Sequence, residues 1–61
     1  MGLKRNNDQL LYKDFIGSVN FSSNDQIYFG KIEGISDLVT FEGNSVQTLT
    51  LDFHQVVEDY I

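Results

Sequence analysis

The sequence predicts a small α+β domain in which a three-stranded antiparallel sheet precedes a single helix, in the order β-β-β-α. Apolar and polar residues alternate from Tyr12 to Phe21, and residues 27–32 are rich in β-branched and aromatic side chains. After Ser45, apolar residues recur every three or four positions. A period of two is typical of a strand with one buried face, and a period near 3.6 is typical of an amphipathic helix.

The first strand is expected to follow an N-terminal tail. Residues 1–10 are mostly polar and show no periodicity, so we expect a flexible tail over residues 1–11 and a folded domain over residues 12–61. The strand expected over residues 12–21 places on one face Phe15, Gly17, Val19 and Phe21.

Two further strands are expected. Residues 22–25 favour a turn, because short polar side chains bond to their own backbone there, and this turn forms a hairpin with a second strand over residues 27–32. A turn over residues 34–37 precedes a short third strand over residues 38–41. The expected core residues are Phe15, Val19, Phe21, Phe29, Val39, Phe41 and Phe53.

A helix is expected to begin at Val46. Ser45 is the expected N-cap, since its hydroxyl can accept an otherwise unpaired backbone N–H. Thr48 stands where a capping box has Glu or Gln, so the reciprocal bond is expected to be weak. Leu51 is expected on the exposed side. The apolar stripe consists of Val46, Leu49, Phe53, Val56, Val57 and Tyr60.

Four glycines are predicted to have structural roles, because they do not form a phosphate-binding motif. Gly17 and Gly30 are expected within strands, where another backbone or an aromatic ring approaches closely. Gly34 and Gly43 are expected in turns that need a positive φ.

The second strand presents two faces. Tyr28 and Ile32 lie opposite Phe29 and are candidates for an exposed sheet surface that could serve as an interface. The simpler interpretation is that both side chains are half-buried in ordinary strand packing.

The charge is unevenly distributed along the chain. The 61 residues carry nine carboxylates and four Lys or Arg, and from Asp14 onward eight acids face only Lys31. Such a surface repels phosphate backbones, so we expect no direct binding of nucleic acid and favour a basic protein partner. The simpler interpretation is that the acidity keeps the domain soluble.

Length and composition indicate one small cytoplasmic domain without cofactors. The chain has no cysteine, no secretory signal and no run of ~20 apolar residues of the kind that spans a membrane. Because so short a chain has a small core, we expect self-association into a homodimer or higher oligomer, or support from a partner.

Carboxylates and a single histidine are the only candidates for catalysis. A two-metal nuclease site would need Asp14, Glu42 and Asp52 to converge, and no sequence pattern brings them together. His54 has no Ser, Cys or second His as a partner, so we expect a boundary or surface histidine, with an interface role as the alternative. The sequence therefore predicts neither an enzyme nor a metal site.

Four segments appear in the order typical of one known family: GSV at residues 17–19, YFGKIEGI at 28–35, DLVTFEG at 37–43 and VEDYI at 57–61. Over residues 12–61 the chain resembles the N-terminal domain of HicB-type antitoxins. The resemblance implies a partial ribonuclease-H-like fold without the nuclease carboxylates. Relatives also have a final strand and a DNA-binding domain, so we expect the natural protein to continue.

The resemblance implies the antitoxin role of a type II toxin–antitoxin system. The domain would bind a small basic HicA-like toxin, an mRNA interferase, and mask its active site. The residues expected to contact this partner are Glu42, Asp52, Glu58, Asp59 and Tyr28.

Two alternatives remain open. The first is a stand-alone interaction or oligomerisation module without a toxin partner, in which an unpaired edge strand adds to another sheet. The second is a residual magnesium-dependent nuclease that uses Asp14 and Asp52.

Overall fold

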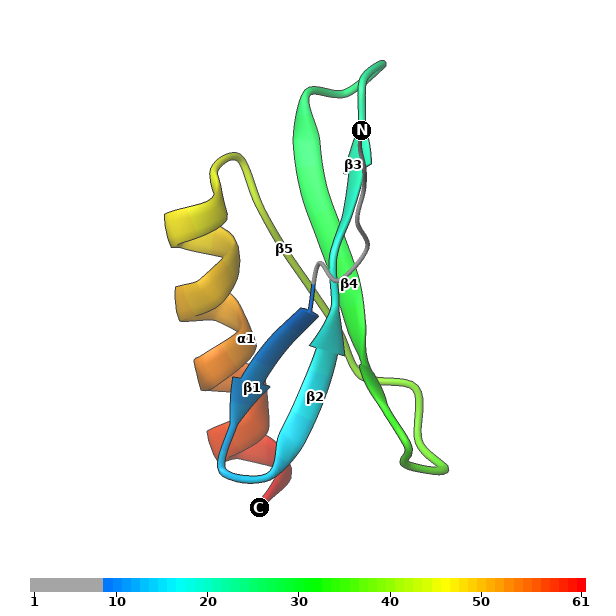
Figure 1. Ribbon diagram of the computed structural model, residues 1–61, viewed down its shortest axis with the longest axis vertical. Helices are drawn as coiled ribbons and strands as arrows, with labels where there is room; N and C mark the ends of the chain where they lie inside the picture. The colour runs from blue at the N-terminus through cyan, green and yellow to red at the C-terminus, as the bar shows by residue number, and fades with distance from the viewer. Residues whose placement is uncertain (1–8) are drawn as a thin grey trace, which may run out of the picture.

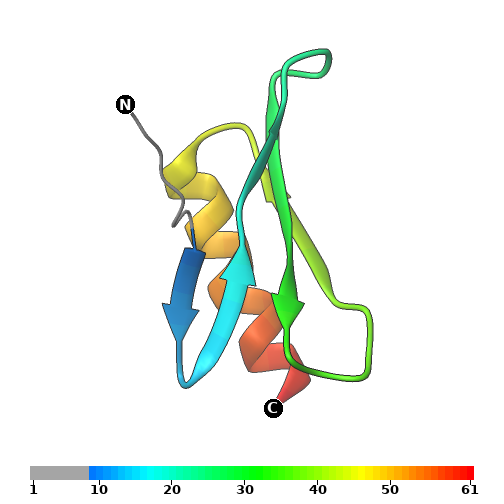
Figure 2. The ribbon, with the colours of Figure 1, turned by 45° about the vertical axis from the view of Figure 1, so that its right-hand side comes forward.

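The computed structural model describes residues 9–61, in which an antiparallel sheet carries one helix on one of its faces (Figures 1 and 2). This arrangement confirms the α+β class, but the sheet has five strand segments where three were expected. In chain order the elements are β1 (Gln9–Tyr12), β2 (Phe15–Ser18), β3 (Asn20–Ser22), β4 (Ile27–Glu33), β5 (Thr40–Gly43) and α1 (Val46–Tyr60).

Strand β4 is the centre of the sheet. Strands β2 and β3 pair in succession along one edge of β4, and β5 pairs along the other edge, all antiparallel. The β3–β4 pair confirms the hairpin expected around residues 22–25. Strand β1 pairs with the outer side of β2, and β3 and β5 each pair only with β4, so β1, β3 and β5 all have an unpaired edge.

The strand expected over residues 12–21 is interrupted at Val19, which separates β2 from β3. The register is unchanged by this interruption. Ile16 pairs with Glu33, and Asn20, four positions later, pairs with Phe29, four positions earlier along β4. The two segments are therefore one bent strand without an inserted residue.

Gly30 allows the bent strand to come close to β4. A Cβ atom at Gly30 would lie 1.8 Å from the backbone oxygen of Ser18, so a larger residue would require the backbone to move. The Ser18 hydroxyl accepts a hydrogen bond from the Lys31 N–H at 3.0 Å and satisfies that donor beside the interruption. The close backbone approach predicted at Gly30 is confirmed.

Strand β1 lies within the segment expected to be a tail. Tyr12 pairs with Phe15, and the two residues between them have positive φ values, 49° at Lys13 and 69° at Asp14. Positive φ at both central positions is the geometry of a two-residue hairpin turn. The expected tail over residues 1–11 is thus wrong for residues 9–11, and residues 1–8 lie outside the described part of the chain.

The third expected strand begins two residues later than predicted. It was expected over residues 38–41, whereas β5 begins at Thr40 and Leu38 is 78% exposed. The Val39 carbonyl oxygen instead accepts a hydrogen bond from the Ile32 N–H at 3.0 Å and closes the loop before β5.

The two glycines expected in turns differ in their roles. Gly34 has a φ of 76°, as expected. The positive φ expected at Gly43 is wrong, because among the described glycines only Gly34 has one. A Cβ atom at Gly43 would lie 2.4 Å from the Leu49 nitrogen, so this glycine lets the first turns of α1 pack against β5.

Helix α1 begins at the predicted cap. The Ser45 hydroxyl accepts the Thr48 N–H at 3.1 Å, and the Thr48 hydroxyl accepts the Ser45 N–H at 3.0 Å. Both halves of the capping box are present. The reciprocal bond, which was expected to be weak with threonine at this position, is therefore formed.

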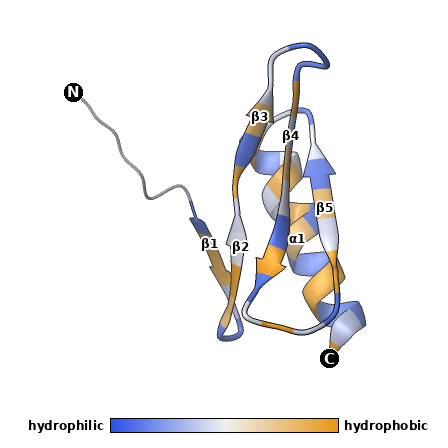
Figure 3. Ribbon diagram, turned by 90° about the vertical axis from the view of Figure 1, so that its right-hand side faces the viewer, coloured by the Kyte–Doolittle hydropathy of each residue, from blue (hydrophilic) through white to orange (hydrophobic). Residues whose placement is uncertain are grey.

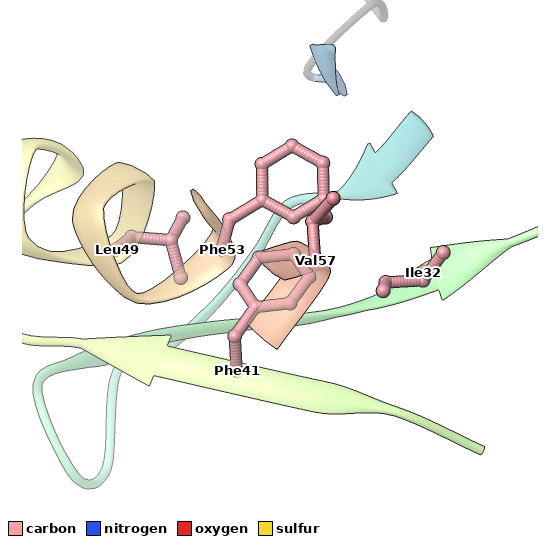
Figure 4. Packing of buried hydrophobic residues seen from close by; sticks show 5 residues of the cluster. All are labelled: Ile32, Phe41, Leu49, Phe53 and Val57. Atoms are coloured by element: carbon pink, nitrogen blue, oxygen red, sulfur yellow. The ribbon is translucent and has the colours of Figure 1, made fainter. Parts of the chain in front are cut away.

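The core lies between α1 and the sheet face that the helix covers (Figure 4). The Phe41 and Phe53 rings pack with their centroids 4.9 Å apart. A Cβ atom at Gly17 would lie 2.8 Å from each of these rings, so the close approach of aromatic rings predicted at Gly17 is confirmed. The buried core side chains are Ile32, Phe41, Leu49, Phe53 and Val57.

Two expected core residues are exposed instead. Phe21 is 49% exposed and Phe29 is 43% exposed. Ile32 and Tyr28, which were candidates for an exposed surface, lie on the helix side of the sheet and contribute to the core. Alternation along β4 separates Phe29 from Ile32 but does not say which of them faces the helix. Apolar residues therefore occur on both faces of the sheet, as the buried Ile32 and the exposed Phe29 of β4 show. Figure 3 shows the hydropathy of each residue along these strands.

Candidate partner-binding surface

The sheet face that α1 leaves uncovered, called the open face below, carries exposed apolar side chains beside carboxylates. Leu11 is 72% exposed and Ile16 is 40% exposed, and the two residues are direct cross-strand partners at one end of this face. Glu33 pairs with Ile16 in the same row. At the other end, Phe29 lies between Asn20 and Glu42. Exposed apolar residues that form a contiguous patch rimmed by polar residues can mark a binding surface, whereas single exposed apolar residues are ordinary.

A groove of about 760 Å³ borders Phe29. Its lining combines aromatic and aliphatic side chains with three carboxylates, and it includes no Lys, Arg or His. A surface of this kind attracts cationic groups and offers them apolar contact. We call it the acidic groove; its main lining residues are Asp25, Ile27, Phe29, Phe41, Glu42 and Asp52.

Two of the predicted partner-binding residues meet in the acidic groove. Glu42 lies on β5 and Asp52 lies on α1, and the Glu42 N–H donates a hydrogen bond to Asp52 Oδ2 at 2.9 Å. A charge-assisted bond of this type is stronger than a neutral one. It joins the helix to the edge strand β5, and both residues line the acidic groove.

Glu58, a third predicted contact residue, is engaged within the chain. Its carboxylate accepts hydrogen bonds from the Tyr12 hydroxyl and from Lys13 Nζ, the latter at 2.7 Å. The bond from Lys13, and then that from Tyr12, lowers the pKa of Glu58, and the bonds to Glu58 raise the pKa of Lys13 and of Tyr12. These contacts attach the β1–β2 hairpin to the last turns of α1.

His54 belongs to the same contact between hairpin and helix. Its ring stacks on that of Tyr12 with centroids 4.0 Å apart and planes 17° apart. The side chain is half-buried, so the predicted boundary position is confirmed. We call the set Tyr12, Lys13, His54 and Glu58 the hairpin clasp.

The remaining two predicted contact residues lie elsewhere. Asp59 is exposed in the last turn of α1 and accepts a hydrogen bond from Gln55 Nε2 at 3.2 Å. Tyr28 is half-buried on the helix side of the sheet and packs on Phe21 with ring centroids 4.7 Å apart. Neither residue adjoins the acidic groove.

The three carboxylates considered for a nuclease site do not converge on one point. Asp14 lies in the turn between β1 and β2, whereas Glu42 and Asp52 meet beside β5. Across residues 9–61, no three His, Asp or Glu side chains are placed to hold one metal ion.

Sequence reasoning missed two residues of the acidic groove. Phe29 was expected in the core, and its exposure depends on which face of β4 the helix covers. Asp25 lies in the β3–β4 loop, and only the folded chain places it in the same groove lining as Glu42. The four-residue loop was visible in the sequence, but the bend between β2 and β3 was not.

Within residues 9–61 no helix is long and apolar enough to cross a membrane. No protein-family model, no curated protein and no solved structure matches this chain, so its function has to be inferred from the surfaces described above.

Proposed function

We propose that this chain is an antitoxin-type binding module that captures a small basic protein, a HicA-like mRNA interferase, and masks its RNA-binding surface. The acidic groove is the observation that carries this proposal. Its lining combines three carboxylates with the part-exposed Phe29 ring and has no basic residue. The toxin's identity comes from the resemblance to HicB N-terminal domains.

Charge favours a basic protein over a nucleic acid as the partner. Residues 9–61 contain eight Asp or Glu and two lysines, and one of these, Lys13, is already paired with Glu58. A surface of this sign raises the rate of encounter with cations and opposes the approach of phosphates. The same charge would therefore select the toxin and reject its RNA substrate.

Masking follows from competition for one surface. An enzyme that cleaves RNA must present cationic groups to the phosphate backbone. Carboxylates that occupy those groups exclude RNA directly. The apolar residues of the open face would then supply burial worth roughly 25 cal/mol per Å² removed from water, which holds the complex together once it has formed.

An RNA-cleavage assay tests the proposal. The purified chain is mixed with the short basic protein encoded in the neighbouring reading frame and a labelled mRNA. We expect cleavage to stop when the chain reaches a stoichiometric amount. Undiminished cleavage with a large excess of chain, or the absence of a neighbouring basic protein, would contradict the proposal.

Self-assembly through an edge strand is the second candidate function. Strand β1 is an edge strand, and its Leu11 is 72% exposed, so it could pair with another sheet. Edge strand β5 is less suited, because Asp52 already accepts its Glu42 N–H. Light scattering tests this candidate: a strictly monomeric chain at high concentration would exclude it.

A further inference from the structure

We propose that the acidic groove is the docking site for an arginine carried by an extended segment of the basic partner. The guanidinium would lie on the Phe29 ring and bond to Glu42 and Asp52. This inference rests on the proposed function, because it specifies which part of a basic partner is bound. It also predicts a preference that overall acidity alone would not give.

Phe29 provides the platform for the cation. Its ring is 43% exposed and lies on the open face in register with Glu42 on the neighbouring strand. Cross-strand partners have Cβ atoms about 5 Å apart, so a group resting on the ring is within reach of the carboxylate. A planar guanidinium stacks on aromatic faces and donates in a rigid fork, which favours arginine over lysine.

Asp52 provides a second carboxylate that is already positioned. Its Oδ2 is held by the Glu42 N–H at 2.9 Å, and no hydrogen bond among residues 9–61 engages Oδ1. The side chain is half-buried, so little rotational freedom remains to be lost when a ligand binds. Asp25, in the β3–β4 loop, adds a third negative charge to the same groove.

The shape of the surface indicates an extended segment. A second hollow of about 270 Å³ shares Phe29, Gly30 and Thr40 with the acidic groove and continues along the open face to Lys31. The combined trough is acidic at one end and has a lysine at the other. A segment with arginine at the acidic end and a neutral or acidic residue near Lys31 fits this polarity.

A second copy of the chain fits the trough less well. Each copy has a formal net charge of −5, so two copies oppose each other over most of their surface. Lys13, one of the two lysines among residues 9–61, is held by Glu58 at 2.7 Å. A foreign basic segment is therefore the occupant that the charges favour.

Nuclear magnetic resonance titration with a defined peptide tests the inference. The probe is the acetylated, amidated peptide Leu-Arg-Leu-Glu, and the matched control replaces the arginine with citrulline, which has nearly the same shape without the charge. We expect saturable shifts centred on the backbone amides of Phe29, Gly30, Thr40 and Glu42. Binding of the citrulline peptide should be about tenfold weaker or undetectable.

Substitutions locate the binding energy. Glu42→Gln combined with Asp52→Asn keeps the hydrogen-bonding shape and should weaken arginine-peptide binding about tenfold. Phe29→Ser should weaken it about fivefold. The matched controls are Asp37→Asn, which removes an exposed loop carboxylate, and Leu51→Ser, which removes a 67% exposed apolar group from the helix. Both controls should change the affinity less than twofold, and thermal melts check that every variant is folded.

The outcomes separate this inference from the proposed function. Equal binding of the citrulline peptide, shifts centred away from the trough, or equal losses in the Asp37 and Glu42 variants would overturn the inference. Toxin neutralisation that survives the Phe29 and Glu42/Asp52 changes would also overturn it and leave the proposed function intact. Arginine-peptide binding in the trough without toxin neutralisation would support the inference and contradict the proposed toxin.

Discussion

At the scale of single residues, close contacts explain why glycine occupies particular positions. Gly30→Ala would place a methyl group 1.8 Å from the Ser18 oxygen, so the backbone must separate there. We expect a loss of about 3 kcal/mol in the free energy of unfolding, at the upper end of the usual cost of overpacking. Gly34→Ala meets no neighbour and should cost about 1 kcal/mol, because only its φ of 76° is unfavourable.

Urea denaturation followed by circular dichroism measures both glycine effects. The comparison matters more than either value, because the two substitutions add the same methyl group. Equal destabilisation by Gly30→Ala and Gly34→Ala would show that the close approach of β2 and β3 to β4 is not a constraint in solution.

Residue patterns predicted part of the candidate site but not its composition. Glu42 and Asp52 were expected to contact a partner, since both are acids outside the expected core, and the structure brings them together. Phe29 was missed because alternation along a strand is symmetrical: it groups Tyr28 with Ile32 but leaves open which group faces the helix. The close packing of Gly30 against Ser18 and the Phe41 ring shows that Tyr28, Gly30 and Ile32 face the helix. The sequence alone does not reveal such a contact.

At the scale of elements, the helix was the most predictable part of the fold. Its N-cap, its exposed Leu51 and the spacing of its buried residues follow from local sequence and are confirmed, whereas Val46 and Tyr60, at the two ends of the expected stripe, are exposed. Strand β1 was not predicted, because Lys13 and Asp14 form a tight turn without the glycine that usually marks one. Asp tolerates positive φ better than most residues, which was the available indication.

The capping box of α1 provides a prediction at this scale. Ser45→Ala removes the acceptor for the Thr48 N–H, and we expect it to destabilise the chain by about 1 kcal/mol. Thr48→Val, which removes the reciprocal bond to the Ser45 N–H, should cost a similar amount. Thr50→Val is the control, since its hydroxyl bonds only to the Val46 carbonyl oxygen inside the helix. Chemical denaturation measures all three, and an equal loss in the control would show that the box adds nothing.

The hairpin clasp gives the attachment of β1 a dependence on pH. The pKa of Glu58 is lowered from 4.5 by Lys13 and Tyr12, so the folded state favours its ionised form. The stabilisation is present above pH 4.5 and is lost as the pH falls through the folded-state pKa. The pKa values of Lys13 and Tyr12 are raised, so their contribution is present below pH 10 and is lost at higher pH.

Thermal melts at a series of pH values test the clasp. Glu58→Gln should lower the melting temperature at neutral pH and flatten its decline on the acid side, because the shifted carboxylate is gone. Asp37→Asn, which removes an exposed carboxylate outside the clasp, should leave the shape of the profile unchanged. A Glu58→Gln profile parallel to that of the original chain down to low pH would contradict the role assigned to this side chain.

At the scale of the whole molecule, the two sheet faces differ in how far their apolar residues are buried. The helix-covered face contributes Ile32 and Phe41 to the core, and the open face exposes Leu11, Ile16 and Phe29. A chain of 61 residues has little apolar surface to spare, so leaving these residues exposed reduces the burial available for folding. Covering the open face with a partner would recover part of that burial.

Association with a basic partner should accordingly be fast and sensitive to salt. With eight acids and two lysines in residues 9–61, electrostatic attraction acts before contact, and added salt screens it over a Debye length of about 10 Å at 0.1 M. Between low and high salt we expect the association rate constant for the neighbouring basic protein to fall about tenfold or more, whereas the dissociation rate changes little. Stopped-flow fluorescence separates the two rates. An association rate that is independent of salt would mean that the apolar open face, and not the acidity of the chain, selects the partner.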